Sequence, residues 1–177
     1  KDKNWRRTLE MSKEFTLTDR AFQRIMQYAK NYYGIDLSQK RVIVEGRLKN
    51  YLSTNGYKSY EDYMDVVERD RDGKEAKSLV NMLTTNHTFF MREFEHFEYF
   101  HKVVLPQLKE KEKSKKDLHI WCAAASSGEE PYTIAMVLMD YFGMEHSQWD
   151  TTVLATDIST KVLEKALKGV YNNEQLV

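Results

Sequence analysis

The sequence predicts an α/β protein in which an all-helical N-terminal domain is followed by the first part of a Rossmann-like sheet. Three observations support this fold class. Apolar residues recur at helical spacing through the first half of the chain. Two short apolar runs, at residues 118–124 and 153–156, are typical of buried strands. Each run leads into a loop and a further helix, an order that places consecutive strands in one parallel sheet.

The composition is that of a globular protein without disulfides. The chain has 177 residues, of which 41% are hydrophobic, with 7 Gly and 2 Pro. Cys122 is the only cysteine, so no intrachain disulfide can form, and its position in an apolar run predicts a small core residue. No apolar run approaches the roughly 20 residues that a membrane helix needs. These features predict a cytoplasmic protein without membrane insertion.

The balanced total charge hides an asymmetry between the two halves. The whole chain has 27 Lys and Arg and 27 Asp and Glu. Residues 1–80 carry 17 basic and 13 acidic residues, a net +4, whereas residues 81–177 carry 10 and 14, a net −4. The basic half favours an acidic surface as a partner, and the acidic half would repel a phosphate backbone. Nucleic acid is therefore not an expected partner.

The helices of the first half have recognisable starts and ends. Thr18 or Asp19 can cap the first helix, and Gly34 is suited to its left-handed end. Ser38 is predicted to cap a second helix, which Gly56 would close. The apolar positions of these two helices are Phe22, Ile25, Met26, Ala29, Tyr32, Tyr33, Val44, Leu48, Tyr51 and Leu52.

Two further helices and a long connecting helix are expected before the sheet. One helix begins at Ser59, and the next follows the turn at Asp72 and Gly73. A long helix is expected after the sequence TTN at residues 84–86, ending in a charged run at 109–116. We therefore predict a helical domain at 1–77, a connecting segment at 78–117 and the first part of the sheet domain at 118–177.

Asp157 follows the second predicted strand, where a ligand is expected. In an open α/β sheet, ligands lie beyond the carboxyl ends of the strands. A carboxylate there can accept hydrogen bonds from both hydroxyls of a ribose, so Asp157 is a candidate ribose ligand. Its alternative is an ordinary helix N-cap or turn aspartate.

The loop after the first strand favours a cationic cofactor. A dinucleotide site uses G-x-G-x-x-G, but only Gly128 is present, and Glu129 and Glu130 follow it. Two carboxylates would repel a pyrophosphate and attract a cationic small molecule such as S-adenosylmethionine. The alternatives are a capping box between Ser127 and Glu130, or Glu130 as the N-cap with Pro131 in the first helical position.

Several motifs resemble one family when they are taken together and in order. They are TTNHTFFMR at residues 84–92, WCAAASSGEEPY at 121–132, ATDIS at 155–159 and GVY at 169–171. With a helical module in front, they resemble the CheR-type chemotaxis receptor (glutamate O-) methyltransferase family over nearly the whole chain. The resemblance implies an enzyme that transfers a methyl group from S-adenosylmethionine to chemoreceptor glutamates, leaving S-adenosylhomocysteine and glutamyl methyl esters that serve adaptation in chemotactic signal transduction.

The resemblance also implies roles for particular residues. Asn86, Thr88 and Arg92 are expected to line the cofactor site, with Arg92 also the candidate catalytic residue. Glu130, or its neighbour Glu129, would contact the cofactor, and Asp157 would hold the ribose. Without the family, Asn86 and Thr88 would be cap or turn residues, and Arg92 a solvated helix arginine.

Receptor docking is implied for the second helix of the helical module. The matching basic residues are Lys40, Arg41, Arg47 and Lys49, and the partner would be the acidic methylation helices of a chemoreceptor. The alternative is a solvated charged face. No metal site is expected, because the five-residue separation of His96 and His101 does not place both on one helical face.

Two rival functions remain open on the sequence. A nucleotide-binding oxidoreductase could share the same strand–helix start, and a non-catalytic receptor-binding or regulatory fragment could share the family motifs. Family members continue beyond GVY, so we expect this chain to be a truncated front part of a methyltransferase. A two-stranded sheet has uncovered edges, so self-association is expected of such a fragment.

Overall fold

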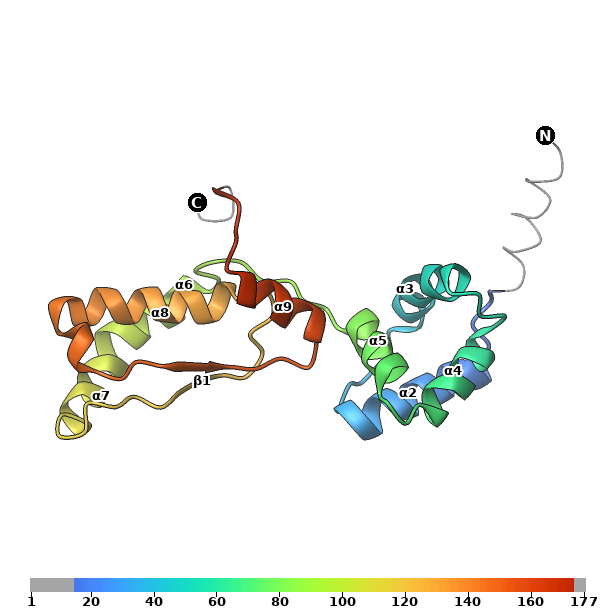
Figure 1. Cartoon of the computed structure of the whole chain (residues 1–177), viewed down its shortest axis with the longest axis horizontal. Helices are drawn as coiled ribbons and strands as arrows, with labels where there is room; N and C mark the ends of the chain where they lie inside the picture. The colour runs from blue at the N-terminus through green and yellow to red at the C-terminus, as the bar shows by residue number, and fades with distance from the viewer. Residues whose placement is uncertain (1–14, 174–177) are drawn as a thin grey trace. The chain divides into compact units, whose positions relative to one another are not determined.

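The computed structural model describes residues 15–173, which divide into two compact units between Thr84 and Thr85 (Figure 1). We call residues 15–84 the helical unit and residues 85–173 the sheet unit. This division agrees in kind with the predicted order of an all-helical part followed by strands. The predicted boundary at residue 77 falls inside a helix, since the last helix of the helical unit ends at Leu83.

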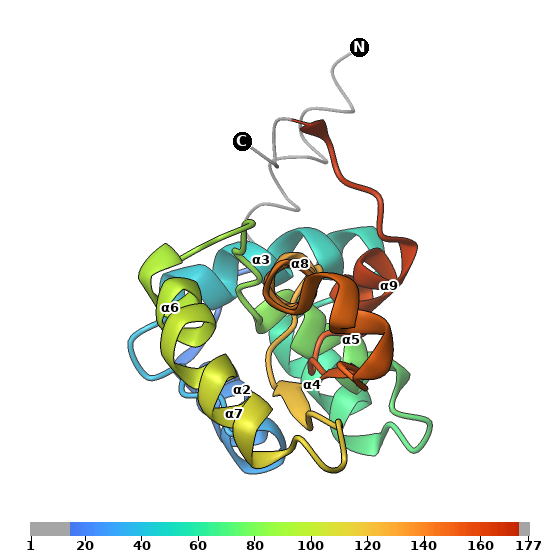
Figure 2. The ribbon, with the colours of Figure 1, turned by 90° about the vertical axis from the view of Figure 1, so that its left-hand side faces the viewer.

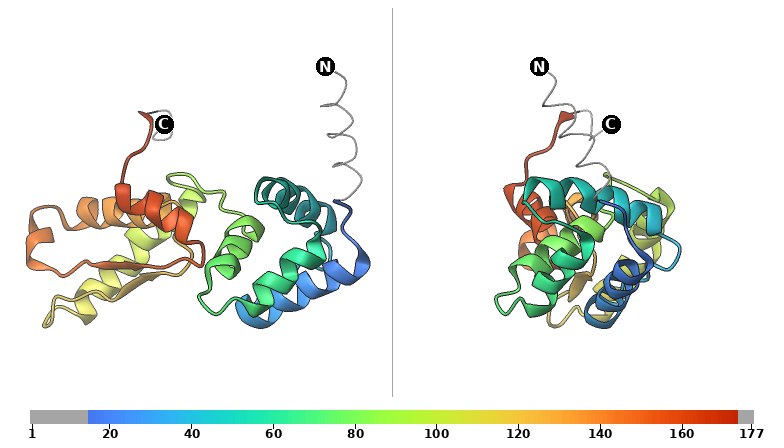
Figure 3. Two further views of the ribbon diagram at one scale, coloured as in Figure 1. Left: turned by 45° about the vertical axis from the view of Figure 1, so that its right-hand side comes forward. Right: turned by 90° about the vertical axis from the view of Figure 1, so that its right-hand side faces the viewer.

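The helical unit is built from α2, α3, α4 and α5. Their bounds are Asp19–Tyr33, Arg41–Thr54, Tyr60–Arg69 and Lys74–Leu83. α2 and α4 lie side by side in Figure 3, and α5 packs on both α3 and α4. Burial of one apolar face from each helix forms a continuous core. Its most deeply buried members include Ile25, Val44, Leu48, Leu52, Tyr60, Tyr63 and Met64.

The predicted start or end of a helix was confirmed at three positions, Thr18, Ser59 and Gly34. The Thr18 hydroxyl oxygen accepts a hydrogen bond from the Ala21 amide at 3.1 Å, and Ser59 Oγ accepts one from the Asp62 amide at 3.1 Å. Gly34 ends α2 with a φ of 69°, the left-handed conformation that glycine adopts without steric cost. These signals work because each connects residues only a few positions apart.

The predicted cap at Ser38 is wrong. The backbone amide of Ser38 donates to Asp36 Oδ1 at 2.9 Å in a turn, and α3 begins only at Arg41, with Lys40 at the N-cap. The side chain of Asp36 satisfies the local backbone first, which delays the helix. The predicted end of this helix at Gly56 is close to the observed one. α3 ends at Thr54, and Gly56 follows in the left-handed conformation with a φ of 77°.

The long helix of the sheet unit begins later than predicted and contains a wide turn. Residues 86–93 form a loop, followed by α6 (Phe94–Tyr99), a π-helical stretch η1 (Phe100–Val104) and α7 (Leu105–Lys111). The Leu105 amide donates to the carbonyl of Phe100, five residues earlier. Pro106 follows directly, and proline cannot donate and collides with the carbonyl four residues before it. A π turn at this point accommodates it within a continuous helix.

The predicted strand–helix–strand order was confirmed as a parallel pair. β1 (Ile120–Cys122) pairs with β2 (Val153–Ala155) in the register Ile120 to Val153 and Cys122 to Ala155. α8 (Glu129–Phe142) and the 3-10 helix η2 (Gly143–Gln148) connect them, and α9 (Thr160–Lys168) follows β2. α8 is seen nearly end-on in Figure 2.

A second core lies between α8 and the connecting helix in the sheet unit. It contains Leu105, Leu118, Val137, Leu138, Phe142 and Trp149. Val137, Leu138 and Phe142 lie in the carboxyl-terminal half of α8, so this core packs that half of the helix near the segments that precede the two strands, away from the predicted site residues at the start of α8. In the part of the chain that the structure describes, no helix is long and apolar enough to cross a membrane.

Candidate functional site

Three separate segments of the sheet unit are tied together by Ser126. Its backbone amide donates to Asp157 Oδ2 at 2.8 Å, and its hydroxyl donates to the carbonyl oxygen of Asn86 at 3.0 Å. Ser126 itself is buried and has a φ of 47° in the loop after β1. The loop after β1, the loop after β2 and the segment at residues 86–93 therefore meet at one place, beyond the carboxyl ends of the strands.

Asp157 organises this junction with both of its carboxylate oxygens. Oδ2 accepts from the Ser126 amide, and Oδ1 accepts from the Ser159 amide at 2.8 Å, immediately before α9. The turn role that the sequence left open is therefore present. Each carboxylate oxygen has a second lone-pair position, and the side chain remains partly exposed, so further acceptance from a ligand is chemically available.

Gly128 allows the loop to turn into α8 while its backbone lies close to Tyr171 and Ala166. Its φ is 102°, and a Cβ added there would collide with the Tyr171 hydroxyl and approach the backbone of Ala166. The Tyr171 hydroxyl donates to the Ser127 carbonyl at 2.7 Å. The GVY sequence thus has a structural role here, because its tyrosine closes over the loop.

The two glutamates at the start of α8 have different environments. Glu129 is 1% exposed, and its Oε2 accepts a hydrogen bond from Ser127 Oγ at 2.6 Å. Glu130 is exposed, and its carboxylate faces a cavity. Neither proposed cap forms: Gly128 is the N-cap without a side-chain bond, and the helix already includes Glu129, so Pro131 is not its first residue.

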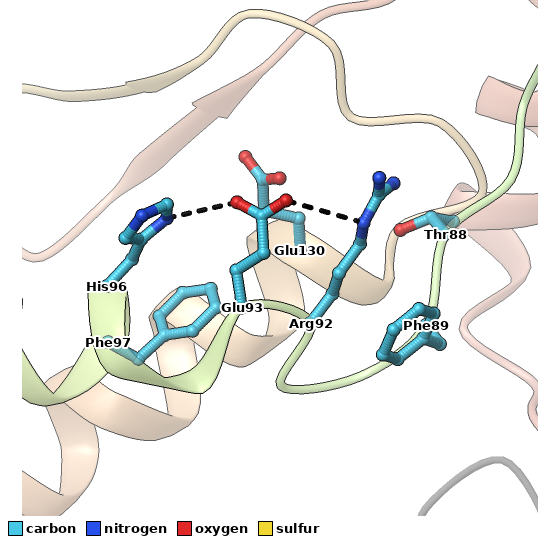
Figure 4. A pocket seen from close by; sticks show the side chains of 7 residues that line it. All are labelled: Thr88, Phe89, Arg92, Glu93, His96, Phe97 and Glu130. Atoms are coloured by element: carbon cyan, nitrogen blue, oxygen red, sulfur yellow. Dashed lines mark ion pairs between the residues drawn. The ribbon is translucent and has the colours of Figure 1, made fainter.

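A cavity of about 420 Å³ lies between the start of α8 and the segment that leads into α6 (Figure 4). Thr88, Arg92 and Glu130 are predicted site residues that it brings together. Asn86 and Asp157 are not among its lining residues and instead belong to the Ser126 junction. The complete lining is Thr88, Phe89, Arg92, Glu93, His96, Phe97 and Glu130.

Arg92 is held by its own loop while its head group remains accessible. Nη1 donates to the His87 carbonyl at 2.9 Å, and Nε lies 3.9 Å from Glu93 Oε1. The side chain is 49% exposed. Since a guanidinium has five N–H donors, this arrangement leaves donors for a carboxylate or another acceptor in the cavity.

Glu93 and His96 are cavity residues that sequence reasoning missed. Figure 4 shows the Glu93 carboxylate between Arg92 and His96, and its Oε2 lies 3.1 Å from His96 Nδ1. The three-residue separation of Glu93 and His96 on a helix start was the available signal, because it places two side chains on one face. In the described part of the chain, no three His, Cys, Asp or Glu side chains are grouped as metal ligands.

Cys122 is a core residue that contacts the edge of the site. Its Sγ donates to Glu130 Oε1 at 3.2 Å, and the residue is 2% exposed. Burial, together with the neighbouring Glu130 carboxylate, raises the pKa of the Cys122 thiol to about 12. A neutral thiol is a weak nucleophile, so the structure agrees with a packing role for Cys122.

The four basic residues predicted to dock a receptor divide into two pairs. Arg41 forms an ion pair with Asp19 at 2.8 Å and also donates to the Leu17 carbonyl. Arg47 donates to the carbonyls at the end of α5, at 2.8 Å for Leu83. The side chains of Lys40 and Lys49 are exposed. The two arginines therefore stabilise the helical unit, and the exposed face of α3 is less basic than its sequence suggests.

Comparison with known proteins relates both units to one family. Residues 20–84 match a family model described as "CheR methyltransferase, all-alpha domain", and residues 86–177 match "CheR methyltransferase, SAM binding domain". A chemotaxis protein methyltransferase of Borreliella burgdorferi is 37% identical over 166 residues, which are 91% of this chain and 58% of the relative. That of Escherichia coli is 38% identical over 170 residues, which are 95% of this chain and 56% of the relative. The chain thus spans little more than half the length of these relatives.

Proposed function

The chain belongs to the CheR methyltransferase family, and on that premise we propose that it is the front part of an S-adenosylmethionine-dependent methyltransferase that modifies glutamates of chemoreceptors. The observation that carries this proposal is the cavity at the start of α8. It brings Thr88 and Arg92 from one family motif to Glu130 from another. We place the activity in the cytoplasm, where receptor methylation regions lie.

The chemistry of the site residues fits S-adenosylmethionine. The Glu130 carboxylate faces the cavity and suits a cationic sulfonium or ammonium group. Asp157 has acceptor positions for ribose hydroxyls, Asn86 lies at the same junction, and Thr88 supplies a polar group in the cavity. The loop lacks the G-x-G-x-x-G pattern, and Glu130 stands near the end of α8 that would attract a pyrophosphate, so a dinucleotide is disfavoured.

The main contribution of the protein to this reaction would be to align the acceptor carboxylate with the methyl group. Bound S-adenosylmethionine would supply an electrophilic methyl group whose departing sulfur keeps the bonding electron pair. The acceptor glutamate is ionised near neutral pH, so its carboxylate oxygen can form the new bond without a strong general base. Holding nucleophile, methyl carbon and leaving sulfur in line can supply roughly 7–11 kcal/mol. Arg92 would hold the acceptor carboxylate or the cofactor by charge-assisted hydrogen bonds.

Receptor docking by α3 is a weaker part of the proposal. Lys40, at the N-cap of α3, and Lys49, within the helix, have exposed side chains. Arg41 and Arg47 are bound within the helical unit and contribute to its stability. We therefore expect docking to an acidic receptor helix to depend on the two lysines, with only modest sensitivity to salt.

A non-catalytic receptor-binding fragment is the second candidate. It is favoured by the small size of the described sheet, which has only two strands. Under this alternative, the helical unit would still bind a receptor, but the sheet unit would not hold the cofactor by itself.

Calorimetric titration with S-adenosylhomocysteine separates the two candidates. We expect saturable 1:1 binding of S-adenosylhomocysteine, weaker binding by Glu130→Gln and no binding of NAD. Glu110→Gln is the matched control, because Glu110 is an exposed glutamate of α7 outside the cavity. Binding of NAD in preference to S-adenosylhomocysteine would overturn the proposed function, and the absence of binding to either would favour the receptor-binding fragment.

A further inference from the structure

A single buried hydroxyl links the two sides of the cavity. Thr133 lies on the first turns of α8 and is fully buried. Its hydroxyl donates to the Glu129 carbonyl at 2.7 Å, and the same oxygen accepts a hydrogen bond from the Met91 amide at 3.2 Å. The bond to Glu129 is the usual contact of a helical threonine with its own helix. The bond from Met91 comes from a segment 42 positions away in the sequence.

The segment that Thr133 holds has a strained backbone on both sides of Arg92. Met91 has a φ of 54° and Glu93 a φ of 56°, both in the left-handed region. Residues other than glycine reach this region at a steric cost, and such conformations persist only when surrounding contacts hold them. Two such residues flank one arginine in the cavity, so the direction of the Arg92 side chain depends on how well this turn is anchored.

The anchor is at the right place to set the geometry of the cavity. Thr133 joins the amide directly before Arg92 to the carbonyl directly before Glu130. Arg92 and Glu130 are the two charged lining residues that the proposed function uses. A shift of this turn would change the separation between a guanidinium and a carboxylate on opposite walls, although Thr133 itself is not a lining residue.

We propose that Thr133 is a positioning residue that fixes the Arg92 turn against the start of α8, and thereby sets the distance between Arg92 and Glu130. This inference rests on the proposed function and deepens it. The hydroxyl is the necessary group, because it can accept from Met91 and donate to Glu129 at once. Serine keeps that capacity, whereas valine keeps the shape and leaves the Met91 amide without its acceptor.

Hydrogen exchange tests the anchor without any ligand. The comparison is between wild type, Thr133→Val and Thr133→Ser, followed at the Met91 amide and, as an internal reference, at the amides of Val137 and Leu138 in the core of the sheet unit. In Thr133→Val we expect exchange at Met91 to rise about fivefold, the effect of losing one hydrogen bond, with the reference amides unchanged. Thr133→Ser should match wild type. Equal exchange at Met91 in all three proteins would overturn the proposal, and so would a uniform rise that includes the reference amides.

A double-mutant cycle tests whether the anchor acts through Arg92. We expect Thr133→Val to weaken S-adenosylhomocysteine binding about fivefold in wild type, and less than twofold in an Arg92→Ala background. An equal loss in both backgrounds would contradict a positioning role. If wild type binds no S-adenosylhomocysteine, the proposed function of this chain fails, while the exchange experiment still decides the role of Thr133.

Discussion

In the helical unit, charged side chains bind the unit's own structure, whereas in the sheet unit several of them line an open cavity. Arg24 pairs with Asp65 at 2.7 Å and Glu68 at 2.8 Å, and Arg47 binds the carbonyls at the end of α5. In contrast, Arg92 and Glu130 leave hydrogen-bonding capacity directed at solvent. Arg24 and Arg47 therefore contribute to the stability of the helical unit, whereas Arg92 and Glu130 are available for a ligand in the sheet unit.

Large apolar and aromatic side chains are buried in the helical unit, whereas some of those on the strands of the sheet unit are exposed. The core of the helical unit contains two fully buried tyrosines, Tyr60 and Tyr63, with their hydroxyls bonded to backbone carbonyls. In the sheet unit, Trp121 on β1 is 67% exposed and Leu154 on β2 is 60% exposed. We infer that mutations should change mainly folding stability in the helical unit and mainly ligand affinity in the sheet unit.

The largest expected effect is on the core of the helical unit. Leu48→Ala should lower the free energy of unfolding by about 2–5 kcal/mol, because Leu48 is fully buried and its removal leaves a cavity. Below the melting transition, affinity for S-adenosylhomocysteine should be unchanged. Val42→Ala on the exposed face of the same helix is the control, with an expected change within about 0.5 kcal/mol. Denaturant melts and calorimetry measure both quantities. A loss of affinity in folded Leu48→Ala would contradict the separation of the two roles.

Arg92→Ala should lower methyl transfer strongly and leave the free energy of unfolding nearly unchanged. We expect methyl transfer by the full-length enzyme to fall about 100-fold, the usual cost of removing a charged group that aligns or stabilises the reacting atoms. The free energy of unfolding should change by less than about 0.5 kcal/mol, since the side chain is half exposed. Radiolabelled methyl incorporation and thermal melts provide the two measurements. Methyl transfer by Arg92→Ala at nearly the wild-type rate would contradict the proposed role of Arg92.

Arg47 and Lys49 offer a matched pair within α3. Arg47→Ala should cost about 1–2 kcal/mol in unfolding free energy, because it leaves the carbonyls of Leu83 and Thr84 without this donor. Lys49→Ala should be nearly neutral for stability and should weaken receptor binding, because the Lys49 side chain is exposed. Chemical denaturation and binding to an immobilised receptor fragment distinguish the two. Equal effects of both variants on receptor binding, with no difference in stability, would restore the docking role of Arg47.

Asp70 should give the smallest effect, visible mainly as a pH dependence. Backbone amides, that of Ala76 first, lower the pKa of the Asp70 carboxyl in the folded state. The resulting stability is present above the unfolded pKa of about 3.9 and is lost as the pH falls through the lower folded value. The melting temperature of Asp70→Asn should therefore lie below that of wild type at pH 7 and approach it at pH 3. Asp72→Asn, at an exposed neighbouring position, serves as the control. A constant gap across this range would mean that the charge of Asp70 is not the cause.

Sequence reasoning succeeded where the physical cause is local. The cap at Thr18, the helix start at Ser59 and the helix end at Gly34 depend on contacts within a few residues, and the change of hydrophobic period located both strands. The predicted cap at Ser38 was wrong because the side chain of Asp36 accepts a hydrogen bond from the Ser38 amide in a turn before the helix. The role of Asp70 in starting α5 was missed because it reaches the amides of Glu75 and Ala76, five and six residues ahead.

Long-range partners explain the rest of the differences. Nothing in the local sequence around Arg47 indicates that it binds carbonyls 36 and 37 positions later. The Met91–Thr133 bond is likewise visible only in three dimensions. At the candidate site, Thr88, Arg92 and Glu130 could be selected from the family motifs. Their separation from Asn86 and Asp157, and the addition of Glu93 and His96, required the fold.

The burial of Cys122 also makes this protein a convenient subject for site-directed labelling. Its thiol is the single one in the chain and is shielded from solvent, and its pKa is raised to about 12. We therefore expect thiol-reactive probes not to react with it at neutral pH. These 177 residues therefore need no cysteine-free background. Ser53→Cys and Lys168→Cys, at exposed positions in different units, would accept a pair of fluorophores or spin labels directly. Distances between such probes would follow the two units in solution as cofactor and receptor are added.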